Sequence, residues 1–197
     1  MSHLAAVDRY AAHIAEAAQR FGVPVAWIRA VMHVESRGDE RAISPVGAMG
    51  LMQIMPATWS NLRDRHGLGN DPFDPHDNIL AGAAYLREMY DRYGSPGFLA
   101  AYNAGPGRVN QWIARFGHPA SPDVDVIDWI EKIPFSETRN YVQRVLESLH
   151  VYRGRLPQAA SLSLAATTWR PQAVWCVYSC GVLLDGQQAA LERENDR

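Results

Sequence analysis

The chain has 197 residues, of which 47% are hydrophobic, 10% aromatic and 20% charged. These proportions are typical of a globular protein and exclude a disordered, collagen-like or membrane-spanning chain. Nineteen basic against 21 acidic residues give a formal charge of −2, so no excess of positive charge is available to neutralise a phosphate backbone, and we expect no nucleic acid partner.

Helical patterns follow one another along the chain and are separated by glycine, proline and serine. Proline is typical of the first turn of a helix and glycine of the position just past its end. An alanine-rich helix is predicted over 2–20, ending before Gly22, and Asp77 or Asn78 is expected to cap a later helix. Further helices are predicted over 25–37, from near Pro56 to 66, and over 79–93, 96–104, 107–116, 126–133 and 134–152.

No segment alternates polar and apolar residues in the way that is typical of a strand. We therefore predict an all-α fold, with an N-terminal helix over 1–20 packing on a domain over 21–155. Over 156–197 the composition changes to Ser, Thr, Ala and Gln around an apolar stretch, which indicates a weakly structured, flexible C-terminal extension. This extension is either an anchor to a partner or a segment without a function of its own.

Two cysteines, Cys176 and Cys180, fall in the extension. They are too few for a disulfide framework and lack the partners of a zinc site, so we assign them no function. The N-terminus lacks the basic start and apolar run of a secretory signal. The longest apolar stretch, 173–184, is shorter than the about 20 residues of a spanning helix, so no membrane segment is predicted.

Glu35 is exceptional because it falls on the apolar side of the predicted helix 25–37. At about 100° per residue, Trp27, Val31 and Met32 share its half of the helix. Burial disfavours the charged form of a carboxyl group and raises its pKa, which would make Glu35 a general acid near neutral pH. The alternative is a structural salt bridge with one of the many arginines.

Four short motifs occur in order along the chain. They are Glu35-Ser36, Gly-Leu-Met-Gln at 50–53, Ala-Tyr-Asn-Ala-Gly at 101–105, and Glu-Thr-Arg followed by Tyr-Val within 137–142. Together they resemble the soluble lytic transglycosylase catalytic domain, a relative of the goose-type lysozyme fold. The resemblance covers about 21–152 and implies a lysozyme-like helical domain.

The resemblance implies a peptidoglycan lytic transglycosylase that works without a cofactor. Such an enzyme cleaves the β-1,4 bond between N-acetylmuramic acid and N-acetylglucosamine, and the 6-hydroxyl of the muramic acid attacks to form a 1,6-anhydro product. Most glycosidases use two carboxyl groups, whereas this family uses one glutamate, and the acetamido group of the substrate replaces the second. Glu35 would donate a proton as an acid and then accept the proton of the 6-hydroxyl as a base.

The same resemblance assigns substrate contacts, or the orientation of Glu35, to several further residues. Glu137 is expected to be a buried acid whose charge helps Glu35 to keep its proton. Structural roles remain open: a turn for Ser44, a helix-start hydrogen bond for Gln53, and core packing for Tyr102 and the methionines. The expected substrate-binding residues are Ser44, Met52, Gln53, Tyr102, Asn103 and Glu137.

Two other functions compete with this one. Asp39 or Glu40 could supply a second carboxylate and make the enzyme a hydrolysing muramidase, although solvated loop charges are the simpler interpretation. A catalytically silent module that binds glycan or scaffolds a wall-spanning complex is the second competitor. It has no need of a buried acid.

One loop superficially resembles a metal site. It lacks the residue order of an EF-hand and is interrupted by prolines, so we expect turn and capping roles and no bound metal. The residues concerned are Asp71, Asp74, His76 and Asp77.

The implied substrate lies outside the inner membrane, so the expected location is the periplasm or cell envelope. Small relatives of this kind serve conjugation or type IV secretion systems and phage tails, and the resemblance admits such machinery as a partner. We expect a monomer that acts on peptidoglycan glycan strands.

Overall fold

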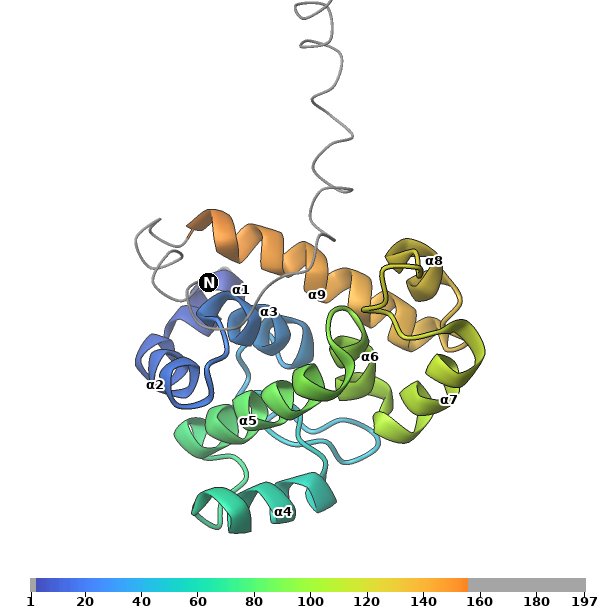
Figure 1. Ribbon diagram of the computed structural model, residues 1–197. Coiled ribbons are helices and arrows are strands. Elements are labelled where there is room, and N and C mark those ends of the chain that lie inside the picture. The colour runs from blue at the N-terminus through green and yellow to red at the C-terminus, as the bar shows by residue number, and fades with distance from the viewer. Residues whose placement is uncertain (1–2, 156–197) are drawn as a thin grey trace, which may run out of the picture.

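The computed structural model describes residues 3–155, and every regular element within that range is an α-helix (Figure 1). The all-α prediction is confirmed for this part of the chain. The predicted extension over 156–197, with Cys176 and Cys180, lies outside the described residues. The helices are α1 (His3–Asp8), α2 (Ala11–Phe21), α3 (Val25–Glu35), α4 (Pro56–His66), α5 (Pro75–Tyr93), α6 (Gly97–Ala104), α7 (Pro106–Phe116), α8 (Val126–Glu131) and α9 (Ser136–Arg155).

The N-terminal segment forms two helices, α1 and α2, in place of the single helix predicted over 2–20. The chain turns at Tyr10, whose backbone N–H donates to the Val7 carbonyl at 3.2 Å. Tyr10 buries its ring in the core, and its hydroxyl donates to the Glu40 carboxylate at 3.0 Å. The burial of one aromatic side chain thus accompanies a turn that the alanine-rich pattern does not predict.

Helix α5 begins one turn earlier than predicted, at Pro75 instead of Ile79. Its N-cap is Asp74, whose side chain accepts a hydrogen bond from the backbone N–H of Asp77 at 3.0 Å. The expected cap at Asp77 or Asn78 is therefore wrong. Proline is well suited to the first helical position, because its missing N–H is not needed there, and this moves the start of the helix.

Helix α3 lies at the centre of the fold and packs against α1, α2, α5 and α9. Its side chains Trp27, Ile28 and Met32 are buried, and the Trp27 ring meets the Phe98 ring of α6 edge to face at 4.9 Å. In Figure 1, α9 runs along the top, α5 crosses the middle and α4 lies below it. Helix α6 packs against both α5 and α9. The end of α3, at Glu35, therefore lies among helices from distant parts of the sequence.

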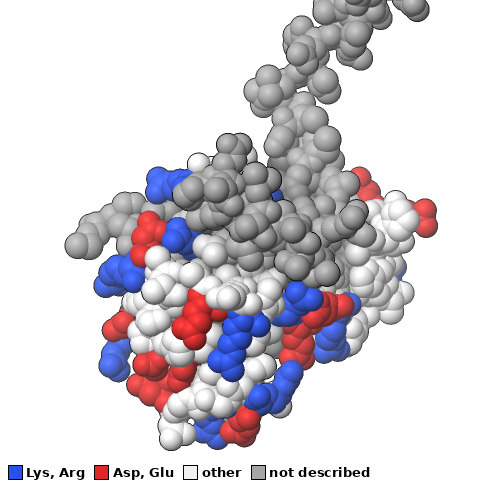
Figure 2. Space-filling view, turned by 60° about the vertical axis from the view of Figure 1, so that its left-hand side comes forward, with Lys and Arg blue, Asp and Glu red and all other residues white. Residues whose placement is uncertain are grey.

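Acidic and basic side chains are interspersed over the face shown in Figure 2, without a broad area of one sign. This distribution agrees with the formal charge of −2. Within residues 3–155, no helix combines the length and the apolar character needed to cross a membrane.

Candidate active site

Glu35 is the last residue of α3 and is partly buried. Burial raises the pKa of its carboxyl group from 4.5 to about 7, and the hydroxyl of Tyr141 and the charge of Arg144 oppose this rise. No basic side chain in the described part of the chain lies within ion-pair distance of Glu35. The alternative prediction of a structural salt bridge is therefore wrong. Near pH 7 the carboxyl group is available in both its protonated and its ionised form, as a group that donates and then accepts a proton must be.

Two tyrosines from different helices lie beside Glu35. Tyr102 of α6 and Tyr141 of α9 are buried, and burial together with the charge of Glu35 raises the pKa of both hydroxyls well above the usual value. Both therefore remain neutral while Glu35 titrates. The Tyr141 hydroxyl makes no hydrogen bond of standard length to any described residue, yet it lies close enough to Glu35 to lower the pKa of that carboxyl.

Tyr141 belongs to the fourth motif but was not predicted as a site residue from the sequence. A signal was present, because Thr138 and Tyr141 are three residues apart and so lie on the same face of α9. Both are buried, and the Thr138 hydroxyl donates to the Asn103 side-chain oxygen at 2.8 Å. The fourth motif thus contacts the third motif at Asn103 and reaches Glu35 through Tyr141.

Tyr102 links α6 to the second motif. Its hydroxyl donates to the backbone carbonyl of Met52 at 2.8 Å, and its ring packs against the ring of Tyr85 with centroids 5.3 Å apart. The contact with Met52 fixes the position of the loop beside Glu35. Tyr102 is thus a buried core residue and a neighbour of the candidate catalytic group, and its contact with a substrate stays a prediction.

Ser44 and Gln53 hold the shape of the loop between α3 and α4. The hydroxyl of Ser44 accepts a hydrogen bond from the Ala48 N–H at 2.9 Å. Gln53 has a left-handed backbone with φ of 49°, and its side-chain amide donates to the carbonyls of Ala42 at 3.0 Å and Gly50 at 2.9 Å. Both side chains are only partly buried, so contact with a substrate remains a prediction for each.

Asn78 of α5 is a positioning residue, although the sequence predicted only a helix cap at this position. Its side chain is fully buried and makes three hydrogen bonds. The oxygen accepts from the Met52 N–H at 2.7 Å, and the amide donates to the carbonyls of Met49 at 3.1 Å and Pro72 at 2.8 Å. Asn78 therefore satisfies backbone groups of the second motif that would otherwise be buried without partners.

Two expected substrate-binding residues are placed differently from the prediction. The Met52 side chain is 0% exposed and packs against α5 at Gly82, where even one added Cβ atom would lie 2.5 Å from it, so it offers no surface to a sugar. The exposed methionine of this segment is Met55, at 43%. Glu137 is exposed in the first turn of α9, and the expectation of a buried acid is wrong because the next residue, Thr138, occupies the buried face.

The acidic residues after α3 have structural partners. Asp39 is exposed and accepts a hydrogen bond from the Arg41 N–H at 3.0 Å, and Glu40 accepts one from Tyr10. Neither is among the groups that shift the pKa of Glu35. Both carboxylates therefore have structural roles as hydrogen-bond acceptors, as the interpretation of solvated loop charges with local partners allows.

The acidic segment at the start of α5 forms a turn and a helix cap. Asp74, His76 and Asp77 place possible ligand atoms within 4.8 Å of one another. Each already has a protein partner, however: Asp74 caps α5, and the His76 ring nitrogens contact Asp77 at 2.9 Å and Glu16 of α2 at 3.1 Å. These contacts raise the pKa of His76 and join α2 to α5. The prediction of turn and capping roles agrees with this arrangement.

Comparison with known proteins assigns the family. The family described as the transglycosylase SLT domain matches residues 12–123. The chain belongs to this family. The resemblance that the four motifs indicated is thereby confirmed.

A bacterial and a phage transglycosylase are similar to this chain. The soluble lytic murein transglycosylase of Escherichia coli is 37% identical over 154 residues, which cover 75% of this chain and 23% of that protein. The transglycosylase of the phage PRD1 is 43% identical over 103 residues, covering 52% of this chain and 37% of the phage protein. This chain therefore spans about a quarter of the length of the Escherichia coli relative.

Solved structures share the fold of this SLT domain. An inactive mutant of the lytic transglycosylase Slt from Pseudomonas aeruginosa, in which glutamine replaces a glutamate, superposes with a TM-score of 0.67 at 37% identity, covering 77% of this chain and 25% of that one. The 70 kDa soluble lytic transglycosylase from Escherichia coli gives a TM-score of 0.66 at 36% identity, with coverages of 74% and 24%. The lysozyme-like lytic transglycosylase fold is thus shown.

Proposed function

We propose that this protein is a peptidoglycan lytic transglycosylase that cleaves the β-1,4 bond between N-acetylmuramic acid and N-acetylglucosamine, with Glu35 as its single acid and base. One observation carries the proposal. Glu35 has a pKa of about 7, and no other carboxyl group is among those that act on it. A pair of carboxyl groups is the usual equipment of a glycosidase that activates water, so a lone glutamate favours a substrate hydroxyl as the nucleophile.

The first step uses the protonated form of Glu35. Its O–H donates a proton to the glycosidic oxygen, the bond from that oxygen to C1 of the muramic acid breaks, and the acetamido group of the substrate stabilises the positive charge at C1. Burial favours this step because it keeps a proton on Glu35 at neutral pH. Tyr141 stabilises the carboxylate that results, because a neighbouring neutral hydroxyl lowers the pKa of the acid.

The second step uses the ionised form. The 6-hydroxyl oxygen of the same sugar attacks C1 and its proton passes to Glu35, which restores the starting state and leaves the 1,6-anhydro product. No water is consumed. Tyr102 and Asn78 hold the second motif in place during both steps through the carbonyl and the N–H of Met52.

The proposed location is the periplasm or cell envelope, where peptidoglycan lies. Relatives named membrane-bound lytic murein transglycosylase C, from Glaesserella parasuis among others, match at 29% identity and support a murein substrate. The similarity to a phage transglycosylase supports local opening of the wall as the task of this protein. We also propose that the protein acts as a monomer and that it serves a conjugation or secretion machine.

Digestion of purified sacculi tests the proposed function. Sacculi are incubated with wild-type protein, with Glu35→Gln, or with the matched surface control Glu147→Gln on α9. The soluble muropeptides are then identified by mass spectrometry. Anhydro-muropeptides are expected from wild type and the control, with a loss of at least about 100-fold for Glu35→Gln. Products with reducing ends would show a hydrolysing muramidase, and binding of sacculi without any release by wild type would show a silent module. Either result overturns the proposal.

A further inference from the structure

The chain makes a tight left-handed turn directly after Glu35. Arg37 has a φ of 56° and Gly38 a φ of 84°, so two consecutive residues have a left-handed backbone. This conformation is unfavourable for a residue with a side chain, such as Arg37, and it persists only where the surroundings hold it. Because Glu35 is the last residue of α3, the same turn sets where the helix ends and how the carboxyl group is presented.

Part of the support for the turn is local. The buried hydroxyl of Ser36 accepts a hydrogen bond from the Gly38 N–H at 3.1 Å and donates to the Met32 carbonyl at 3.3 Å. The Asp39 N–H donates to the Ser36 carbonyl at 3.1 Å. These bonds do not use the carbonyl of Gly38, which has its partner in a distant part of the chain.

Residues 6–10, the N-terminal clamp, supply that partner and cover the turn. Ala6 of α1 lies so close to Gly38 that a Cβ atom added there would be 2.9 Å from its backbone carbon. The Arg9 guanidinium donates to the Gly38 carbonyl at 3.2 Å and to the Ala6 carbonyl at 3.3 Å. The Tyr10 hydroxyl donates to Glu40 at 3.0 Å. The clamp therefore contacts the turn at Gly38 and again just after it.

The N-terminal clamp is also anchored to α3 itself. Val7 and the ring of Tyr10 are buried in the core. The carboxylate of Asp8 pairs at 2.9 Å with Arg29 of α3, six residues before Glu35. Helix α1 lies against α3 (Figure 1). The clamp thus joins the body of α3 to the turn that ends it, and it fixes the one relative to the other.

We propose that the N-terminal clamp positions Glu35 for catalysis by holding the turn over 36–40, with Arg9 as its main positioning residue. This inference rests on the proposed function, because it concerns the same acid and base. The clamp lies before the family match, which begins at residue 12, and contains none of the four motifs. The groups that act on the Glu35 carboxyl are Tyr141 and Arg144 of α9, so the clamp acts through the backbone.

Replacement of Arg9 tests the hydrogen bond to the turn. Full-length Arg9→Ala protein loses this bond, and Arg9→Lys keeps a positively charged donor. The matched control is Arg20→Ala, because Arg20 donates to the His66 carbonyl at 2.9 Å. In both arginines the guanidinium lies 5.4 Å from the ring of the following residue. The control therefore removes the same kinds of contact at a different turn.

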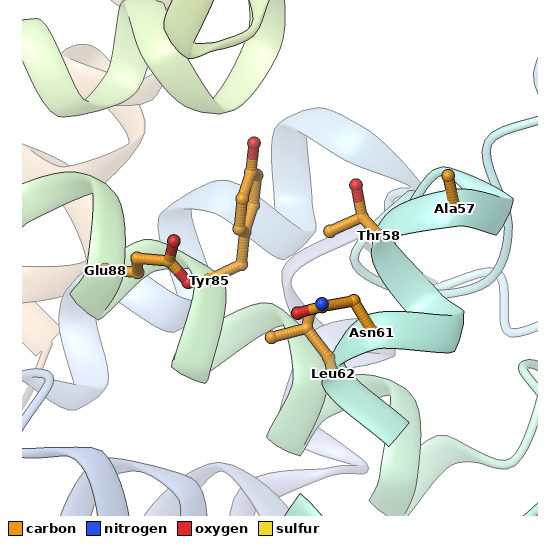
Figure 3. Close-up of a pocket in the computed structure, with 6 residues that line it drawn as sticks. All are labelled: Ala57, Thr58, Asn61, Leu62, Tyr85 and Glu88. Atoms are coloured by element: carbon orange, nitrogen blue, oxygen red, sulfur yellow. The ribbon is translucent and has the colours of Figure 1, made fainter. Parts of the chain in front are cut away.

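Gly38→Ala tests the contact from the side of the turn. Its Cβ atom would meet the Ala6 backbone, so the turn and the clamp must move apart. Gly67→Ala is the matched control, since Gly67 also has a positive φ, of 66°, but no atom lies within 4 Å of its Cβ position. Gly67 follows α4, the helix that carries Asn61 and Leu62 beside the cleft in Figure 3, so its strain falls on a different part of the fold.

The titration of Glu35 is the first measurement, followed by carbon-13 NMR of protein labelled at the glutamate carboxyl groups, with Glu35→Gln to identify the signal. In Arg9→Ala and Gly38→Ala the pKa of Glu35 should fall from about 7 toward 4.5, because a looser turn lets water reach the carboxyl. Loss of the positive charge of Arg9 would by itself raise this pKa. A fall therefore reports a change of position, and Arg9→Lys should reverse most of it.

Steady-state kinetics on soluble glycan strands is the second measurement. We expect kcat to fall about three- to tenfold for Arg9→Ala and about 10- to 100-fold for Gly38→Ala, since small misplacements of a catalytic group are costly. KM should stay within about twofold, because the clamp does not reach the substrate. Both controls should leave kcat and the pKa of Glu35 unchanged. If Gly38→Ala does not fold, the exposed Arg9 position still decides.

Several results would overturn the N-terminal clamp as a positioning device. They are a pKa of Glu35 that stays near 7 in Arg9→Ala, an equal shift in Arg20→Ala, and activity lost equally at every pH in step with the melting temperature. Failure of the proposed function is a separate outcome. If wild-type protein releases no anhydro-muropeptides, the lytic activity is wrong, whereas the NMR titration still decides whether the clamp holds Glu35.

Discussion

The hydroxyl of Tyr141 on α9 lies beside the carboxyl group of Glu35 at the end of α3 and opposes the burial that raises the pKa of that carboxyl. This hydroxyl is buried and has no hydrogen bond of standard length to the described residues. Its polar interaction is therefore with the carboxyl group of Glu35, whose pKa it lowers. A neutral group can stabilise the carboxylate without abolishing the acid form, which a directly paired arginine would do.

Replacing Tyr141 with phenylalanine removes this hydroxyl and keeps the ring. We expect the pKa of Glu35 to rise above its value of about 7, because burial would act with less opposition. The alkaline limb of the activity profile should move to higher pH, and kcat should fall because the carboxylate that forms in the first step loses the hydroxyl that stabilises it. Profiles of kcat/KM against pH measure the shift.

The control for Tyr141→Phe is Tyr152→Phe on the same helix, whose hydroxyl lies 3.5 Å from the His33 ring and does not act on Glu35. Since the Tyr141 hydroxyl has no standard hydrogen bond, its removal should not lower the free energy of unfolding by more than about 1 kcal/mol. A pH profile that stays in place, with activity lost at every pH, would contradict this role.

Glu35→Gln should change how stability depends on pH. The pKa of Glu35 is 4.5 in its ordinary state and about 7 in the folded protein, so the folded state holds the proton more tightly. Stabilisation by that proton is complete below pH 4.5 and is lost as the pH rises to about 7. Wild type should therefore lose up to about 3 kcal/mol relative to Glu35→Gln across this range. Urea unfolding at a series of pH values measures the difference, and a difference independent of pH would refute it.

Gly82→Ala should destabilise the protein although alanine favours helices. A Cβ atom at this position of α5 would lie 2.5 Å from the Met52 side chain. Overpacking of this kind costs about 1–3 kcal/mol, and displacement of Met52 moves the carbonyl that holds Tyr102. We expect a lower melting temperature and a lower kcat.

Gly154→Ala is the matched control for Gly82→Ala, because it is also a helical glycine but faces open space. It should stabilise the protein by about 0.5–1 kcal/mol. Equal effects of the two substitutions on thermal unfolding would show that the close approach at Gly82 does not matter.

Asn78→Ala should weaken both folding and catalysis. The substitution leaves the Met52 N–H and the carbonyls of Met49 and Pro72 without their buried partner. Unsatisfied buried groups cost about 1–3 kcal/mol each, so the free energy of unfolding should fall by several kcal/mol. Activity measured well below the melting temperature should also fall. The exposed Asn140→Ala on α9 should change neither quantity, and an Asn78→Ala protein as stable as wild type would disprove this role.

The sequence predicted those features of the site that depend on one helix or one motif. Glu35 was found because the 3.6-residue period of α3 places it among apolar neighbours. Tyr141 and Asn78 were missed as site residues because their importance arises only when α9 and α5 pack around α3. Neither the lengths of the loops nor the local sequence pattern specifies how α9 and α5 pack against α3.

The wrong predictions for Glu137 and Met52 also arise because a local motif does not specify the direction of each side chain. Glu137 and Thr138 are adjacent in the sequence, but on a helix they differ by about 100° in direction, so one is exposed and the other buried. Met52 and Met55 lie in one short segment, yet the left-handed Gln53 between them turns the chain, and only Met55 is exposed. In both cases the motif was identified correctly and the direction of a side chain was not.

The packing of α9 against α3 also has a consequence for the order in which the protein becomes active. A ribosome makes α3 long before α9, and until α9 docks Glu35 lacks the helix that carries Tyr141 and covers the end of α3. In an open chain its carboxyl group is an ordinary solvated acid with a pKa near 4.5, ionised at neutral pH and unable to donate a proton. On the proposed mechanism, a partly folded chain would lack the acid form of Glu35 at neutral pH and would gain it only when α9 docks against α3.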